Sequence, residues 1–143
     1  MDSLSVPSTT EAAVGPDANV AYLAVENGFA IVDISDPEAL SLIERRTGLL
    51  QDRKGGPLKE ILDVKVDGNR LLVVGPANGH EEPSIEGALL YDVSDPRNPS
   101  RELFYETEYP IHNAYLKDDL VYLVDGDRLR IVKLEGGGTQ VGM

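Results

Sequence analysis

Two nearly identical phrases constrain the fold of this chain more than any other feature of its sequence. IVDISDP occupies residues 31–37, and LYDVSDP occupies residues 90–96. Each phrase joins a strand-like apolar run to a Ser-Asp-Pro turn, and several more strands fit between the two. A chain that repeats such a phrase is built from repeated structural units. The repeat therefore indicates architecture rather than chemistry.

Alignment on this phrase reveals three copies of one pattern, which begin near Asn19, Ile61 and Ile111. In each copy two short apolar runs, rich in β-branched and aromatic residues, follow one another across a polar link such as ENG, DGN or DGD. Such runs and links predict β-hairpins. Units of about 40–50 residues that contain several short strands are typical of β-propeller blades.

The apolar runs are nearly continuous rather than alternating, which favours sheets that are covered on both faces. The segments DPEALSLIERR and DPRNPSRELFYE are each interpreted as a turn and an outer strand, because the two prolines of the second disfavour a helix. We therefore predict an all-β fold of antiparallel β-propeller-type blades. We expect about two and a half to three blades, which is a partial propeller or one completed by an oligomer.

The same pattern sets the expected boundaries of the blades. Residues 1–18 are rich in Ser, Thr, Pro and Gly and are expected to form a flexible N-terminal lead. Residues 136–143 are expected to be a Gly-rich tail or a truncated linker. Between them, residues 19–135 divide into blades at about 19–50, 58–108 and 109–135.

The residues FAIVDISDPEAL and ALLYDVSDPRNP, each after a strand of the VAYLAV type, resemble the LVIVD-repeat family of β-propeller proteins. The resemblance spans about residues 19–135. It implies a propeller fold and an extracellular or cell-surface location rather than a cytoplasmic one, but no particular activity. The third copy departs from the family pattern, because IVKLEGGG replaces the aspartate and the Ser-Asp-Pro turn.

Ser-Asp-Pro recurs where a strand must end and the chain must reverse. We interpret Asp36 and Asp95 as turn formers, whose carboxylates accept hydrogen bonds from backbone amides just ahead. Pro37 and Pro96 then fix φ and cannot donate to a neighbouring strand. A calcium site is the alternative, but DISD supplies two carboxylates where calcium takes six or more oxygen ligands.

The loop NGHEEPSIEG gathers His80, Glu81, Glu82 and Glu86 within a few residues. Histidine and carboxylates together are ligands for a divalent cation, so this loop is the candidate metal site. It is not the HExxH zinc motif, because residue 84 is Ser. The alternative is a solvated loop between two strands, with no cofactor in the protein.

The segment YPIHNAYL supplies the candidate ligand-binding residues, which are Tyr109, His112, Asn113 and Tyr115. It precedes the strand expected to be innermost in the third blade, and propeller ligands commonly lie at the mouth of the central channel. The alternative is that His112 and Asn113 bond loop backbone groups. No serine or aspartate stands at a spacing that indicates a nucleophilic triad, so we assign no catalytic residues.

The charge of the chain excludes one class of partner and suggests an environment. The chain contains 13 Lys and Arg residues and 25 Asp and Glu residues, so its net charge is −12. This negative charge argues against nucleic-acid binding. An acidic, lysine-poor surface fits a protein from a salt-adapted organism, and an ordinary acidic domain is the alternative. The chain has no cysteine and no run near the roughly 18 apolar residues of a membrane span.

Propellers typically close with about four to eight blades, so a chain with three blades leaves two sheet faces uncovered. We expect a protein partner, further blades of the same protein or a homo-oligomer to cover them. The expected function is a non-enzymatic scaffold for interactions. The alternative is that this chain is part of a propeller hydrolase or lyase, with or without a metal. Residues outside this chain would then complete the active site.

Overall fold

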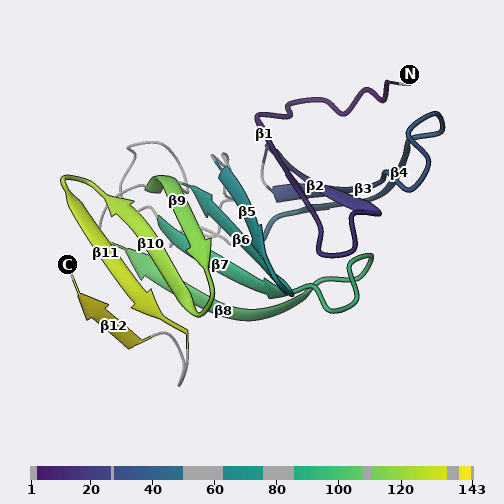
Figure 1. Cartoon of the computed structure of the whole chain (residues 1–143). Helices are drawn as coiled ribbons and strands as arrows, with labels where there is room; N and C mark the ends of the chain where they lie inside the picture. Colours follow the sequence, from purple (N-terminus) through teal and green to yellow (C-terminus); the bar gives the residue numbers. More distant parts are fainter. Residues whose placement is uncertain are drawn as a thin grey trace.

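The fold is a row of three β-sheets. The computed structural model describes residues 3–26, 28–49, 63–75, 86–107, 111–134 and 139–142. Within these residues the chain forms twelve strands and no helix, and the strands make three four-stranded sheets (Figure 1). The predicted all-β, propeller-type fold is confirmed.

Each sheet is an antiparallel meander whose strands lie side by side in chain order. The first sheet contains β1 (Glu11–Val14), β2 (Val20–Val25), β3 (Gly28–Asp33) and β4 (Ser41–Thr47). The second contains β5 (Asp63–Asp67), β6 (Arg70–Gly75), β7 (Glu86–Asp92) and β8 (Ser100–Thr107). The third contains β9 (Ile111–Lys117), β10 (Leu120–Asp125), β11 (Arg128–Lys133) and β12 (Thr139–Gly142).

The turns form where the polar links predicted them. Gly68, between β5 and β6, has a φ of 55°, and Gly126, between β10 and β11, has a φ of 62°. Asp118 takes a φ of 55° between β9 and β10. Two-residue hairpin turns need positive φ, which glycine adopts without strain and aspartate tolerates. The turn chemistry therefore fixes the register of these hairpins.

The three sheets share one irregularity. The pairing of each third strand with its fourth strand shifts register once, which marks a β-bulge. The shift falls between Ile31 and Val32 in the first sheet, between Leu90 and Tyr91 in the second, and between Ile131 and Val132 in the third. These residues are counterparts in the repeat, so the third copy keeps the backbone pattern although its sequence departs most.

The first strand of each sheet lies innermost. β1 contacts β5, and β5 contacts β9, whereas β4, β8 and β12 form the outer edges (Figure 1). We call the face of a sheet that is directed toward the next sheet in chain order its forward face, and the opposite one its rear face. Sheets that stack in this manner around their first strands have the arrangement of propeller blades.

The forward face of the first sheet packs on the rear face of the second. Tyr22, Phe29 and Ile31 meet Leu89 and Tyr91 in one buried cluster. The ring of Phe29 lies edge-on to Tyr22, with centroids 6.3 Å apart, and edge-on to Tyr91, with centroids 5.1 Å apart. Edge-to-face rings stabilise a core beyond the area they bury.

A second cluster joins the second and third sheets. Leu72 and Leu90 on the forward face of the second sheet pack against Val121, Leu123 and Val132 on the rear face of the third. The middle sheet is thus buried on both faces. This explains why its central strands, β6 and β7, are nearly continuous runs of apolar residues.

Two expected boundaries need correction. Residues 11–14 of the expected flexible lead form β1, which pairs with β2 through Ala13 and Tyr22. Residues 139–142 of the expected tail form β12, which pairs with β11 through Thr139 and Lys133. Neither segment has a strand-like apolar run, so backbone pairing with an apolar neighbour determines its conformation.

We predict that Tyr22→Phe destabilises the protein. The buried Tyr22 hydroxyl donates a hydrogen bond of 2.7 Å to the Pro96 carbonyl, across the first two sheets. Burial, with a smaller contribution from nearby Asp17 and Asp95, raises the pKa of Tyr22 to about 12, so the hydroxyl stays protonated at neutral pH. Its loss should lower the free energy of unfolding by about 1–2 kcal/mol in urea denaturation.

The matched control is Tyr115→Phe, at a ring that is largely exposed. This change should leave the unfolding curve in place. An equal loss of stability in both variants would contradict the role of the bond between Tyr22 and Pro96.

Candidate functional site

The forward face of the third sheet carries an open groove of about 410 Å³. β9, β10 and β11 supply most of its lining, and β5 adds one residue at the inner edge. The main lining residues are Lys65, Asn113, Tyr115, Tyr122, Val124 and Leu129.

Strand alternation explains why these side chains gather on one face. In β10, Val121 and Leu123 enter the core, so Tyr122 and Val124 are directed to the other side. Cross-strand pairing then places Tyr115 beside Tyr122, and Leu129 beside Val124. The groove is therefore a direct product of the hairpin register.

The groove is apolar and exposed. Tyr115 is 57% exposed, Val124 48% and Leu129 47%. The rings of Tyr115 and Tyr122 lie 6.2 Å apart at an angle of 55° and form an aromatic wall. Tyrosines with an apolar body and a polar hydroxyl are enriched where proteins bind one another.

A bulge in β9 shapes the inner end of the groove. Between the pairs Leu123–Ala114 and Asp125–Ile111, β9 contains one residue more than β10, so His112 and Asn113 lie opposite Val124. The Asn113 carboxamide oxygen accepts a hydrogen bond of 2.9 Å from the backbone amide of Ala114. Asn113 thus bonds backbone, as the structural alternative expects, while it also lines the groove.

Of the four predicted ligand-binding residues, the structure brings Asn113 and Tyr115 together in this groove. His112 lies on β9 between Ile111 and Asn113, but its side chain is outside the described part of the molecule, as is all of Tyr109.

An ion pair that the sequence did not predict holds Lys65 at the inner edge of the groove. Asp63 on β5 is 3% exposed, and its Oδ2 lies 3.3 Å from Nζ of Lys65. Its Oδ1 is buried without a hydrogen-bond partner among the described residues. A buried carboxylate is costly unless it is paired, and Lys65 compensates one oxygen. The sequence carries no signal for this pair, because an aspartate at the start of a strand usually marks an exposed turn.

A second hollow, of about 610 Å³, lies at the hairpin ends of the second and third sheets. It is acidic, and Arg70 pairs there with Asp119 and approaches Glu102. The backbone amide of Asp118 donates a 2.6 Å hydrogen bond to Asp67. These contacts join the two sheets, so the hollow is explained by the packing of the blades.

No three histidine, aspartate or glutamate side chains converge as metal ligands among the residues that the structure describes. The predicted metal ligands His80, Glu81 and Glu82 lie outside those residues. Glu86 begins β7, and its side chain is likewise not described. The metal site at this loop therefore stays a prediction.

The Ser-Asp-Pro turn has the predicted role at Asp36. Its Oδ1 accepts a hydrogen bond of 2.9 Å from the Glu38 amide, which closes the turn around Pro37. In the second copy, the Asn98 amide donates to the Asp95 carbonyl at 3.0 Å, which closes the turn around Pro96 through the backbone.

The first aspartate of each phrase is also a turn former, which the sequence analysis did not predict. Asp33 Oδ1 accepts bonds from the Ser35 amide at 2.9 Å and from the Ser35 hydroxyl at 2.5 Å. Asp92 accepts a 2.7 Å bond from the Ser94 amide. Hydrogen bonds from Ser94, through its hydroxyl and then its amide, lower the pKa of Asp92.

Asp33 also joins two sheets. Its Oδ2 lies 2.8 Å from a guanidinium nitrogen of Arg97, which belongs to the turn after β7. The Ser35 hydroxyl bond and then the Arg97 bond hold the pKa of Asp33 far below its usual range. We call this contact between Asp33 and Arg97 the inter-sheet ion pair.

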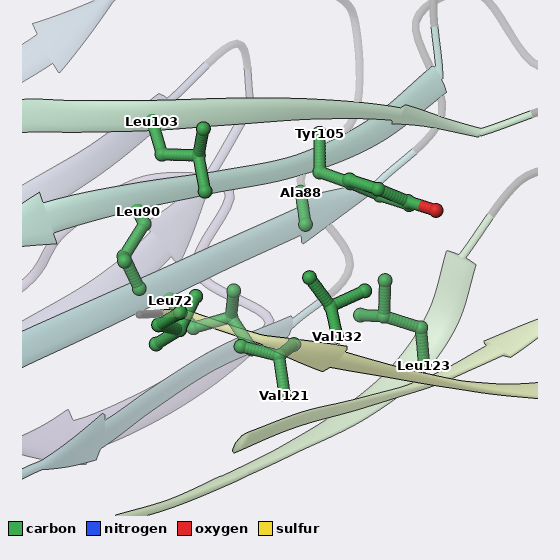
Figure 2. Close-up of a pocket in the computed structure, with 9 residues that line it drawn as sticks. Leu72, Ala88, Leu90, Leu103, Tyr105, Val121, Leu123 and Val132 are labelled. Atoms are coloured by element: carbon green, nitrogen blue, oxygen red, sulfur yellow. The ribbon is translucent and has the colours of Figure 1, made fainter. Parts of the chain in front are cut away.

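The interior has no room for a ligand at the junction of the second and third sheets. A void of about 10 Å³ is lined there by apolar side chains, and Figure 2 shows Leu72, Leu90, Val121 and Val132 directed into it. A space of that size is at the lower limit for one water molecule, and an apolar one stays dry. It is a packing defect rather than a site.

Three meander sheets, stacked around their first strands, define a β-propeller-type repeat protein. Comparison with protein families agrees, because the family model of the LVIVD repeat matches residues 18–47, which include β2, β3 and β4. Residues 18–47 therefore carry an LVIVD repeat, and the predicted resemblance is confirmed over these residues. No curated protein matches the chain. In the described residues, no helix has the length and apolar character needed to cross a membrane.

We predict that Asp33→Asn reduces the acid sensitivity of the fold. Because the folded state lowers the pKa of Asp33, the ionised carboxylate stabilises the protein above about pH 4, and this contribution is lost as the pH falls further. The variant should be less stable at pH 7 and change less between about pH 4 and pH 2. Urea denaturation across this range measures both effects.

Asp127→Asn is the control, at a side chain that is 94% exposed. It should preserve the acid transition of the unchanged protein. An Asp33→Asn variant with the same loss of stability on acidification as the unchanged protein would refute this account.

Proposed function

We propose that this chain is a non-enzymatic propeller scaffold that binds a protein partner through the forward face of its third sheet. The observation that carries the proposal is the cluster of three exposed large apolar residues, Tyr115, Val124 and Leu129, on that one face. A contiguous apolar patch that no part of the described chain covers marks an interaction surface.

The chemistry of the face favours a protein over a small ligand. Small-molecule sites are concave and combine an apolar lining with convergent polar groups. Here the lining is the face of a sheet, and Asn113 and Lys65 are its polar side chains besides the tyrosine hydroxyls. Aromatic side chains on a rigid sheet fit the core of a protein–protein interface.

The resemblance to surface and secreted LVIVD proteins supports an extracellular or cell-surface location for this scaffold. The alternative of a hydrolase or lyase site depends on His112 and on the loop with Glu81, Glu82 and Glu86. Glu81 and Glu82 and the side chains of Glu86 and His112 lie outside what the structure describes. It stays a prediction from the sequence.

The acidic surface supports adaptation to salt. With a net charge of −12, the chain repels itself at low ionic strength, and salt screens this repulsion. We predict that the free energy of unfolding in urea rises between about 0.1 M and about 2 M KCl, because at about 1 M salt the Debye length is already near 3 Å. An unchanged or lower value at high salt would contradict a salt-adapted protein.

Photo-cross-linking tests the proposed surface. With p-benzoylphenylalanine in place of Val124, we expect a covalent adduct with one defined protein, identified from its cross-linked peptide. The matched control carries the same group in place of Ser100, which is exposed on β8, and should give no such adduct. The adduct should also be lost when Leu129→Lys is added. Absence of any adduct at position 124, or equal adducts at both positions, would overturn the proposal.

A further inference from the structure

The described lysines of this protein lie around the groove of the third sheet. The chain has five lysines, of which the structure describes Lys65, Lys117 and Lys133. Lys65 lines the groove at its inner edge. Lys117 on β9 and Lys133 on β11 both pair with Leu120 on β10, so they lie about 10 Å apart, one on each side of Leu120. Every described lysine therefore borders one face of a protein whose net charge is −12.

Strand alternation directs Lys117 and Lys133 to the side of the groove. Leu116 on β9 and Val132 on β11 are buried between the second and third sheets, so the residues that follow them face the opposite way. Both lysines are exposed. Within the described residues Lys117 forms no ion pair, so its charge is available to a partner.

Among the described residues of β9, β10 and β11, no carboxylate stands at a strand position of this face. These positions hold Asn113, Tyr115, Lys117, Leu120, Tyr122, Val124, Leu129, Ile131 and Lys133. The carboxylates of the turn between β9 and β10, Asp118 and Asp119, line the acidic hollow between the second and third sheets, where Asp119 pairs with Arg70. The forward face of the third sheet is therefore positively charged around an apolar centre.

The forward faces of the first two sheets carry acidic residues at positions where this face has none. The strand pairings align the three sheets from the base of each central hairpin. The acidic residues are Asp33 and Asp92 at that base and Glu11 and Asp63 on the innermost strands, and their counterparts in the third sheet are Lys133 and Asn113. The third copy has thus removed the negative charges of the face while it kept the apolar centre.

The buried Asp63 holds Lys65 with its ammonium group toward the groove. The side chain of Asp63 is 4% exposed and that of Lys65 is 38% exposed, so a partner meets the positive end of this pair. Asp63 Oδ1 has no hydrogen-bond partner among the described residues, and a buried carboxylate of this kind lowers stability. Such a local cost is characteristic of residues that position a functional group.

Asn113 adds hydrogen-bond donors beside Lys65. Its carboxamide oxygen already accepts the bond from the Ala114 amide, which leaves the carboxamide nitrogen to donate into the groove that Asn113 lines. A carboxylate accepts such bonds and opposes the lysine charges, so it satisfies both groups at once.

We infer, resting on the proposed function, that the partner of this face is an acidic protein segment. Its apolar side chains pack on Val124 and Leu129, and its aspartates or glutamates meet Lys65 and Lys117 at the edges of the groove. Opposite charges around an apolar centre fix the orientation of a partner and accelerate its association.

The same features disfavour other occupants. Nucleic acid gains nothing from the apolar centre, and the net charge of −12 repels its phosphates. A propeller sheet that docks as the second sheet docks on the first brings an arginine, the counterpart of Arg97, to the place of Lys133, where the two charges repel.

Charge reversal in the photo-cross-linking experiment tests the inference. In the chain with p-benzoylphenylalanine at position 124, Lys117→Glu should lower the yield of the protein adduct about threefold or more, because an attraction becomes a repulsion. Lys117→Arg keeps the charge and should keep the yield. Arg45→Glu makes the same change of charge at an exposed position on β4 and should also keep it. Circular dichroism verifies that each variant is folded. Lys65 is left unchanged, because its loss would leave Asp63 buried without a counter-ion.

A synthetic peptide gives a second readout on the unchanged chain. The probe is a fluorescein-labelled peptide with a Leu-Phe-Leu centre and glutamates on both sides, and its control has lysines in place of the glutamates. Fluorescence anisotropy should detect binding of the glutamate peptide alone. Its Kd should rise severalfold between about 0.1 M and about 0.5 M KCl, because salt screens the attraction.

The outcomes separate this inference from the proposed scaffold. An adduct that is insensitive to Lys117→Glu, or one whose cross-linked peptide is not acidic or comes from this chain itself, overturns the acidic partner and leaves the scaffold standing. Equal binding of the two peptides, or a Kd that does not rise with salt, also overturns the acidic partner alone. Absence of any protein adduct at position 124 overturns both proposals.

Discussion

The burial of one sheet face against another is the interaction on which this structure depends. Each four-stranded sheet is too thin to have a core of its own, so its apolar side chains leave water only when a neighbouring sheet covers them. The middle sheet is covered on both faces, and residues such as Leu72 and Val73, which face opposite ways, are both about 1% exposed. The first sheet is covered by the second on one side, and on its other side Ala30 and Val32 are buried as well. The third sheet is covered by the second on one side, and its other side carries the exposed residues Val124 and Leu129.

Polar contacts then determine how the sheets are placed. Apolar packing alone is non-directional and permits one sheet to slide on another. The bond from Tyr22 to Pro96, the inter-sheet ion pair and the pair of Arg70 with Asp119 each connect a sheet to a turn of its neighbour. Two of these contacts, through Pro96 and Arg97, use the Ser-Asp-Pro turn of the second sheet, and the third uses the turn between β9 and β10. The Ser-Asp-Pro turn thus serves in sheet placement as well as in chain reversal.

The sequence predicted the hairpins well, because apolar runs and turn residues act locally. It did not predict β1 or β12, whose residues have little strand propensity and take their conformation from β2 and β11. It also did not predict the buried Asp63, because burial depends on which face of β5 meets β9. Of the residues that line the groove, the sequence predicted only Asn113 and Tyr115. Tyr22 and Tyr122 have similar neighbours in sequence, so the sequence does not distinguish them. The stacking of the sheets buries Tyr22 and leaves Tyr122 half-buried in the groove.

The third copy keeps the apolar face of the repeat and changes its polar contact. Counted from the base of each central hairpin, Tyr122 and Leu129 on the third sheet stand where Tyr22 and Phe29 stand on the first, and they stay large and apolar although the second sheet does not cover them. Lys133 stands where Asp33 stands, so the third sheet has no carboxylate at this position for an ion pair like the one between Asp33 and Arg97. Apolar packing is non-directional, whereas the ion pair fixes how two sheets are placed. The third copy has therefore kept the part of the repeat that buries a sheet and lost the part that orients it.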